Sequence, residues 1–247
     1  GGGWLAITAP AEWGGTAMPR AIGMAVSEMF TGANVSFSIY GGLTVAAANL
    51  LVHYAPEAFK DTAVRKLYAG AWAGTMCLTE AGAGTAVGDN RTRATRTDQE
   101  GVYRLEGEKV FISGGDHDLT ENILHVVLAR TPGAPSGTKG LSIFLCPKFL
   151  FAPDGTLGER NGVVVAGIEE KMGIHGSPTC TLALGGDKPC VGYLMGAEGQ
   201  GMEIMFHMMN EARIGVGIQG LAGAAAAYNY ALAYAKERIQ GTDIADM

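Results

Sequence analysis

The spacing of apolar positions changes twice along the chain, and these changes predict three structural segments. Up to about Gly70 the pattern is helical: residues 42–55 are apolar on nearly all sides, and the next segment begins with Pro56 and stops at Gly70. Proline suits the first turn of a helix and glycine suits its end. Because helices that are apolar all round are buried, this part is predicted to be a helical bundle.

The middle of the chain, residues 71–196, has the pattern of a β domain. Short β-branched or alternating runs are separated by glycine, proline and aspartate, at residues 102–113, 123–130, 140–147, 163–170 and 179–186. Such spacings are typical of an antiparallel sandwich or barrel. Helical sequence without proline then resumes. The predicted fold class is therefore α+β, with a partial N-terminal helical domain at 1–70, the β domain at 71–196 and the start of a second helical bundle at 197–247.

The charge balance favours a small-molecule ligand. The 247 residues carry a net charge of -6 and contain no long run of lysine or arginine, so neither nucleic acid nor an anionic membrane surface is expected as a partner. The four cysteines form no CxxC pair and have no histidine at zinc-ligand spacing. They are expected to be reduced thiols of a cytoplasmic protein, with no bound metal.

Membrane insertion is not expected either, because no apolar run reaches the roughly 20 residues that span a bilayer. The sequence begins without methionine, already inside an apolar pattern, and stops shortly after a helical segment. These ends are typical of an internal piece of a longer chain.

Residues 76–90, MCLTEAGAGTAVGDN, place glycines and threonine hydroxyls directly after an apolar run. The absence of a lysine excludes a Walker loop, and Gly84 is followed by Gly88 and polar sequence rather than by the third glycine and the helix of a dinucleotide fingerprint. Two interpretations remain: a cradle of open backbone N–H groups flanked by the hydroxyls of Thr79 and Thr85, or a plain hairpin turn.

Three other stretches have simpler structural interpretations. GVGIQG, residues 215–220, matches GxGxxG but follows helical sequence, which favours close helix contact over a dinucleotide site. DHD, residues 116–118, lacks the further ligands of a metal site and is interpreted as a polar turn. His53 lies in an apolar run, where a hydrogen-bonded core histidine is favoured over a ligand.

Combined with GEKVFISGGDHD, residues 107–118, the glycine-rich loop resembles the acyl-CoA dehydrogenase family. TEAGAGTA is similar to that family's TEPGAGSD-like loop and FISGG to its WITNG-like strand end. APAEWGG, EEKMGIHGSPT and NEARIGVGIQG extend the resemblance over nearly the whole chain. The resemblance implies a central β domain between two helical domains, with FAD held at their junction.

The family's site residues transfer to matching positions of this sequence. For FAD these are Met76, Cys77, Leu78, Thr79, Gly82, Gly84, Thr85, Phe111, Ile112 and Ser113, with Arg238 reaching the pyrophosphate across a dimer interface. For the acyl-CoA they are Thr85, Asn210 and Arg213. Phe111 stands where the family has tryptophan, and Ser113 where it has threonine, and the loss of the indole N–H removes one donor.

No residue of this chain matches a catalytic base of the family. Removal of the α proton needs a carboxylate, which most members carry late in the C-terminal bundle and a minority carry immediately before the arginine of the first long helix, where this chain has Ala212. Glu211 is one residue away, about 100° around a helix, and Glu80 is interpreted as structural. The 247 residues alone are expected to be inactive.

The resemblance implies FAD-dependent α,β-dehydrogenation of a short acyl-CoA thioester by a homodimer or tetramer, with electrons passed to an electron-transfer flavoprotein. GGDHDLTENILHVVLAR, KGLSIFLCPKF and LGERNGV resemble the branch that acts on 3-(methylthio)propanoyl-CoA. Two alternatives stay open at this point. One is a flavin oxidase or monooxygenase on the same fold, and the other is a flavin-free scaffold without catalysis.

Overall fold

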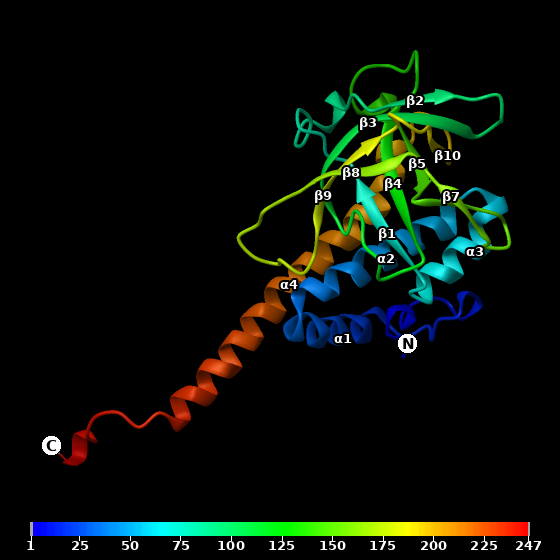
Figure 1. Ribbon diagram of the computed structural model, residues 1–247. Coiled ribbons are helices and arrows are strands. Elements are labelled where there is room, and N and C mark those ends of the chain that lie inside the picture. The colour runs from blue at the N-terminus through cyan, green and yellow to red at the C-terminus, as the bar shows by residue number, and fades with distance from the viewer. Residues whose placement is uncertain (1, 247) are drawn as a thin grey trace.

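The computed structural model describes residues 2–246 and consists of a helical layer, a curved sheet and one long final helix (Figure 1). The helices are α1 Arg20–Ala33, α2 Val35–Tyr54, α3 Glu57–Tyr68 and α4 Gly201–Glu237. Short 3-10 turns occur at Trp4–Ala6, Ala11–Trp13, Val87–Asp89, Thr138–Gly140 and Ile244–Asp246. The predicted α+β arrangement, in which a β domain lies between two helical segments of the chain, is confirmed.

The helix boundaries follow from the residues at the helix ends. Asn34 separates α1 from α2, and its side chain accepts a hydrogen bond from the N–H of Phe37, which satisfies one free donor of the first turn. Pro56 precedes Glu57, the first residue of α3, and Gly70 follows its end in the left-handed conformation, with φ 71°. Both punctuating residues therefore act where the sequence predicts.

Helix α2 corrects one expectation. Its 20 residues, with a mean hydropathy of 1.6 over the most apolar window, are long and apolar enough to cross a membrane, although no run of that length was expected. The helix lies instead between α3, α4 and β1, and Ala47, Ala48 and Leu51 are fully buried against them. From the same helix, Asn49 donates to Glu211 of α4 and Thr44 accepts from the N–H of Gly74 in β1. These contacts are those of the core helix of a packed domain.

The strands form an eight-stranded sheet that closes on itself. They are β1 Trp72–Cys77, β2 Arg93–Arg96, β3 Val102–Ser113, β4 Asn122–Arg130, β5 Leu141–Pro147, β8 Val163–Ile168, β9 Thr179–Leu184 and β10 Cys190–Met195, with β6 Phe149–Phe151 and β7 Leu157–Arg160 as a separate hairpin. Strand β2 pairs with both β3 and β4, which closes the ring β4-β5-β10-β3-β2. All five expected strands are present, but β1 and β4 run parallel, so the sheet is mixed rather than purely antiparallel.

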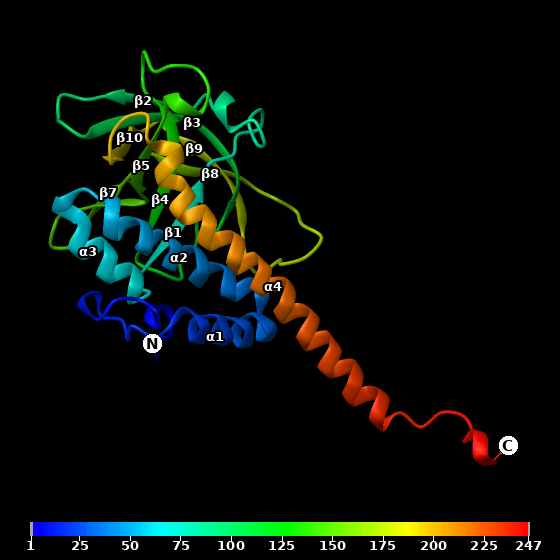
Figure 2. The same cartoon turned by 180° about the vertical axis from the view of Figure 1, so that it is seen from behind.

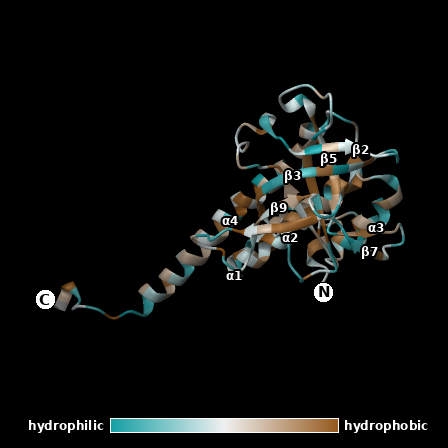
Figure 3. Cartoon of the chain, turned by 45° about the horizontal axis from the view of Figure 1, so that its top comes forward, coloured by the Kyte–Doolittle hydropathy of each residue, from teal (hydrophilic) through white to brown (hydrophobic). Residues whose placement is uncertain are grey.

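Two hydrophobic cores lie on the two sides of this sheet. One joins the helices to the outer face of β1, β4 and β5 and contains Leu51, Leu67, Trp72 and Met205. The other fills the barrel and contains Leu105, Phe144 and the four cysteines, which are all free thiols. Figure 3 shows the brown, hydrophobic positions gathered where α2 meets the strands, and teal positions along β3. Strand β1 therefore separates the helix layer from the barrel interior.

Helix α4 begins against the sheet and ends far from it. Ile204, Met205 and Met208 are buried at its start, whereas most residues after Ala222 are exposed. Its last third projects away from the rest of the molecule (Figures 1 and 2). Residues 215–220 lie in the middle of α4 with no turn, so GVGIQG is helix sequence and forms no dinucleotide loop.

Candidate functional site

The two stretches singled out in the sequence meet in space. Strand β1 ends at Cys77, and two residues later the carbonyl of Thr79 accepts a hydrogen bond of 2.9 Å from the N–H of Val110 in β3. The next residue, Phe111, has φ 61° and a ring that is 61% exposed. A positive φ is costly for an aromatic residue, and such strained positions occur at turns and cluster near functional sites. The pairing of β3 with β9 shifts register here, between Lys109 and Ile112.

The glycine-rich loop is a tight turn and also exposes backbone N–H donors. The two interpretations of its sequence therefore do not exclude each other. Glu80 and Ala83 exchange backbone hydrogen bonds of 3.2 and 3.0 Å, which closes the turn. Within residues 2–246, the N–H groups of Ala81, Gly82, Gly84 and Thr85 make no hydrogen bond to the protein. The turn therefore exposes several backbone N–H donors that make no hydrogen bond within the described residues.

The hydroxyl groups beside this turn are also free to bind a ligand. In the part of the chain that the structure describes, the side chains of Thr79, Thr85 and Ser113 make no hydrogen bond. Thr79 and Ser113 are partly buried and Thr85 is exposed. Cys77 and Ile112 point into the barrel core, at 1% and 2% exposure, so they can offer a ligand only their backbone. The donor set fits an acceptor-rich planar ring lying across the two stretches.

A buried ion pair supports the turn from inside. The ammonium of Lys109, at 0% exposure, lies 2.9 Å from Glu80 Oε1 and donates to the carbonyl of Leu78 at 3.0 Å and to Asn90 Oδ1. The carboxylate of Glu80 also accepts from the N–H groups of Arg91 and Thr92 at 2.6 and 3.0 Å. Every proton of the ammonium has an acceptor, which a neutral amine with two N–H groups would not match.

The protonation of this pair follows from those contacts. Burial alone would raise the pKa of Glu80, but the hydrogen bonds from Thr92, Arg91 and Lys109 outweigh it and hold the pKa below its ordinary value. Burial lowers the pKa of Lys109, and Glu80 opposes that shift. The pair is therefore Glu80 carboxylate with Lys109 ammonium. The structural role expected for Glu80 is what its contacts show.

The bend after β3 is braced by α2. Gly114 adopts φ 63°, and a Cβ there would lie 3.5 Å from the ring of Tyr40. The hydroxyl of Tyr40 donates to the carbonyl of Gly176 at 3.0 Å, and its ring contacts His117 edge to face with centroids 5.0 Å apart. Tyr40 thus joins α2 to both loops beside Ser113. Nothing in the sequence pattern identified it.

Asp116 completes the anchoring of this bend through two ion pairs. Its carboxylate pairs with Lys148 at 2.5 Å and with Arg160 at 2.8 Å. Among residues 2–246, no group of three or more histidine, cysteine, aspartate or glutamate side chains has metal-binding geometry. The polar turn predicted for residues 116–118 is therefore an ion-paired turn.

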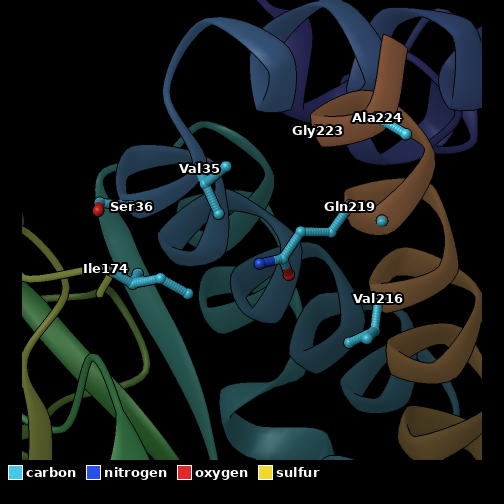
Figure 4. A pocket seen from close by; sticks show the side chains of 8 residues that line it. Val35, Ser36, Ile174, Val216, Gln219, Gly223 and Ala224 are labelled. Atoms are coloured by element: carbon cyan, nitrogen blue, oxygen red, sulfur yellow. The ribbon is translucent and has the colours of Figure 1, made fainter. Parts of the chain in front are cut away.

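A pocket of about 700 Å³ opens between α2, α4 and the loop that follows β8. Val35, Ser36, Ile174, Val216 and Gly220 are among its lining residues. Figure 4 shows Gln219 extending from α4 across the pocket toward α2. Most of the lining is apolar, which suits a hydrocarbon or thioether chain with one polar anchor.

Helix α4 presents different residues to the pocket and to the helix layer. Ala212 is one turn before Val216 and shares its face, whereas Glu211 is about 140° away from Val216 around the helix. Glu211 instead accepts hydrogen bonds of 2.7 and 2.8 Å from Asn49 and forms an ion pair with Arg20. These contacts separate Glu211 from the pocket.

The remaining candidate residues lie along the outside of α4. Arg213 donates to Asn210 Oδ1 at 3.2 Å, and its guanidinium lies over the ring of Phe206. Both members of the pair are exposed. Arg238 directly follows the last residue of α4, on the part that projects from the molecule. One chain therefore does not bring Arg238 to the other predicted flavin residues, and its contact across a dimer stays a prediction.

Sequence reasoning missed two functional features, the buried Lys109 and the pocket, and only Lys109 had a signal in the sequence. Lys109 stands at an inward position of β3, between buried Leu105 and Ile112, and an inward lysine requires a buried acid such as Glu80. The pocket had no such signal because its walls come from segments distant in sequence. Only the packing of α4 across α2 brings Val35 near Gly223.

Proteins of known family are similar to this chain in sequence. Residues 75–186 match the acyl-CoA dehydrogenase middle domain. The chain is 42% identical over 243 residues to a 3-methylmercaptopropionyl-CoA dehydrogenase of Ruegeria pomeroyi, covering 98% of this chain and 40% of that protein. It is 44% identical over 236 residues to a butyryl-CoA dehydrogenase of Syntrophomonas wolfei, covering 93% of this chain and 38% of that protein. The chain thus spans about 40% of the length of these relatives.

A solved structure agrees with the sequence relatives. The acyl-CoA dehydrogenase of Bacillus anthracis, determined with FAD, superposes with a TM-score of 0.78 at 27% identity, over 96% of this chain and 38% of that one. The match includes the helix layer, the barrel and α4. By sequence and by structure, nearly the whole chain is similar to acyl-CoA dehydrogenases, and residues 75–186 match the middle domain of that family.

Proposed function

We propose that the protein of which these residues are part is an FAD-dependent acyl-CoA dehydrogenase that introduces an α,β double bond into a short acyl-CoA thioester. The observation that carries the proposal is the hydrogen bond from the N–H of Val110 to the carbonyl of Thr79. This bond brings together two stretches whose donors are free to bind a ligand. The FAD-bound relative of Bacillus anthracis has the same fold, which supports FAD as the group held there.

The residues of the chain would hold the ring and balance its charge. Bound FAD would supply the acceptor for the hydride that leaves the β carbon. The N–H groups of the turn and the hydroxyls of Thr79 and Ser113 would donate to the ring, which favours the negative charge of its reduced form. The exposed ring of Phe111 would pack beside it and exclude water from the reacting face.

The pocket between α2 and α4 would take the acyl chain. Its apolar walls suit a short chain, and the amide of Gln219 is a polar anchor within them. The relatives named for 3-methylmercaptopropionyl-CoA and butyryl-CoA support a short substrate, with the thioether as our first candidate. Arg213 and Asn210 lie on the same helix, where they would meet the CoA portion.

The α proton needs a carboxylate that the pocket face of α4 does not provide, since Ala212 occupies the expected position. The base would therefore come from another segment of the whole protein. Electrons would pass to an electron-transfer flavoprotein, and the assembly would be a homodimer or tetramer in which Arg238 crosses to the partner. A cytoplasmic location is proposed on the same grounds as the reduced thiols.

The test is a visible spectrum of the purified whole protein, followed by anaerobic addition of 3-(methylthio)propanoyl-CoA or butyryl-CoA. A bound flavin that bleaches with substrate is the expected result. Rapid reoxidation by air with stoichiometric oxygen consumption would indicate an oxidase instead. A colourless protein that takes up no added FAD would leave only a scaffold role.

A further inference from the structure

The peptide bond between Leu78 and Thr79 has one end fixed and the other open. The carbonyl of Leu78 accepts a hydrogen bond of 3.0 Å from the buried ammonium of Lys109. This bond is trans, as are all those described in the chain, and in a planar trans peptide the C=O and the following N–H point in opposite directions. The N–H of Thr79 therefore points away from Lys109.

The N–H of Thr79 is also free to donate to a ligand. Within the described residues, the N–H of Thr79 has no acceptor, although the carbonyl of Thr79 is bonded to Val110. The peptide groups on both sides of the Thr79 Cα are thus held, one by Lys109 and one by β3. The free N–H lies among the other unspent donors of the turn.

Lys109 cannot easily move from this position. It is fully buried, and its three donors are spent on Leu78, Glu80 and Asn90. A positive charge at this depth acts over a low dielectric, so it is felt more strongly than a charge in water. Glu80 balances it, but the carboxylate is shared among four donors from Arg91, Thr92 and Lys109.

We propose that Lys109 is a positioning residue that, through the carbonyl of Leu78, aims the N–H of Thr79 at the flavin and makes reduction of the bound ring easier. The inference rests on the proposed function, since it needs a flavin at this place. It assigns separate roles to the two members of one ion pair. Lys109 orients a donor and contributes positive charge, whereas Glu80 holds the loop around residues 91 and 92.

The experiment compares two variants that break the same ion pair. Lys109→Met removes the donor to Leu78, whereas Glu80→Gln keeps Lys109 with its bonds to Leu78 and Asn90. The midpoint potential of bound FAD is measured for each protein by reductive titration beside a reference dye. For Lys109→Met the preference for reduced over oxidised flavin is expected to fall about tenfold, which is about 30 mV for a two-electron couple. No fall is expected for Glu80→Gln.

A second comparison protects the test against misfolding. Lys109→Met leaves a buried carboxylate without its partner and is the variant at risk, so the double variant Glu80→Gln with Lys109→Met is measured beside Glu80→Gln alone. The double variant is expected to show the same tenfold fall. Flavin affinity of the apoproteins, followed by fluorescence quenching, gives a readout that needs no turnover.

The outcomes separate this inference from the function on which it rests. Equal falls in Lys109→Met and Glu80→Gln would show that the pair only supports the loop, and would overturn the inference. An unchanged potential in the double variant relative to Glu80→Gln would do the same. Failure of the unmutated protein to bind FAD would instead overturn the proposed function.

Discussion

Asn49 and Glu211 join the second and the last helix, because the side-chain amide of Asn49 lies 2.7 and 2.8 Å from the two carboxylate oxygens of Glu211. Arg20 pairs with the same carboxylate, and the hydroxyl of Tyr68 donates to the side-chain amide oxygen of Asn49, Oδ1. Each of the four residues belongs to a different helix. Burial raises the pKa of Tyr68 to about 12, with Glu211 adding to the shift, so Tyr68 stays a donor at neutral pH.

This cluster is expected to stabilise the packing of α4. Asn49→Ala would leave the Glu211 carboxylate short of two hydrogen bonds, and we expect a loss of about 3 kcal/mol in the free energy of unfolding. Urea denaturation measures it. Asp61→Asn is the matched control, because it breaks an exposed ion pair with Arg65 and is expected to cost less than about 0.5 kcal/mol. Equal losses in the two variants would contradict a special role of the cluster.

The hydroxyls of Thr79 and Ser113 are predicted to retain the flavin. Replacing each by alanine removes a donor to a buried acceptor, at about 1 to 3 kcal/mol per site, or roughly 5- to 150-fold in Kd. Titration of the apoprotein with FAD measures the change. Thr95→Ala, on the exposed face of β2, is the control and should bind FAD as before. Unchanged affinity in the double variant would remove these hydroxyls from the site.

Sequence patterns predicted this fold wherever a local rule was sufficient. The runs at residues 102–113 and 179–186 alternate as strands should, and Asn34, Pro56 and Gly70 act at helix ends by their own chemistry. The short strands β2, β6 and β7 were missed because three or four residues are too few to show a period. The six-residue strands β1 and β10 were missed as well. Parallel pairing of β1 with β4 is a tertiary choice without a local signal.

Some features of the candidate site could also be predicted from the sequence, whereas others are visible only in the structure. The glycine-rich loop was singled out because its glycines and threonines have a chemistry of their own, whereas the end of β3 was singled out only through the family resemblance. Their contact through Thr79 and Val110 is a long-range hydrogen bond, and a resemblance could imply it but no spacing could. Tyr40 was missed because an aromatic residue in an apolar helix predicts core packing. Only the structure shows that the hydroxyl of Tyr40 donates a hydrogen bond to the carbonyl of Gly176.

His125 is predicted to make stability depend on pH. It lies fully buried in β4 with Nδ1 2.7 Å from the hydroxyl of Thr75, and burial lowers the pKa of His125 to about 4. The unfolded chain, with an ordinary pKa near 6.5, binds the proton first as pH falls. The contribution of neutral His125 is therefore complete above about pH 6.5 and is lost as pH falls toward 4.

The size of this effect can be measured by urea denaturation at pH 7.5 and pH 5.0. His125 is expected to account for about 2 kcal/mol of the stability lost between these values. His125→Asn keeps a polar atom for Thr75 but does not titrate, so its loss should be smaller by that amount. His117, whose pKa is also lowered, first by burial, titrates in both proteins and cancels in the comparison. An equal pH dependence in both would contradict the assignment.

The last prediction concerns the missing base and uses the two faces of α4. Glu203 and Glu211 both lie about 140° from Val216 around the helix, so neither carboxylate faces the pocket. The 247 residues, loaded with FAD, are therefore expected not to bleach with butyryl-CoA under anaerobic conditions. Ala212→Glu would place a carboxylate on the pocket face, where a positioned base contributes roughly 10² to 10⁴ in rate. Slow bleaching is expected in that variant and not in an Ala212→Gln control. Bleaching of the unmutated chain that disappears in Glu211→Gln would show that α4 turns in solution and that Glu211 is the base.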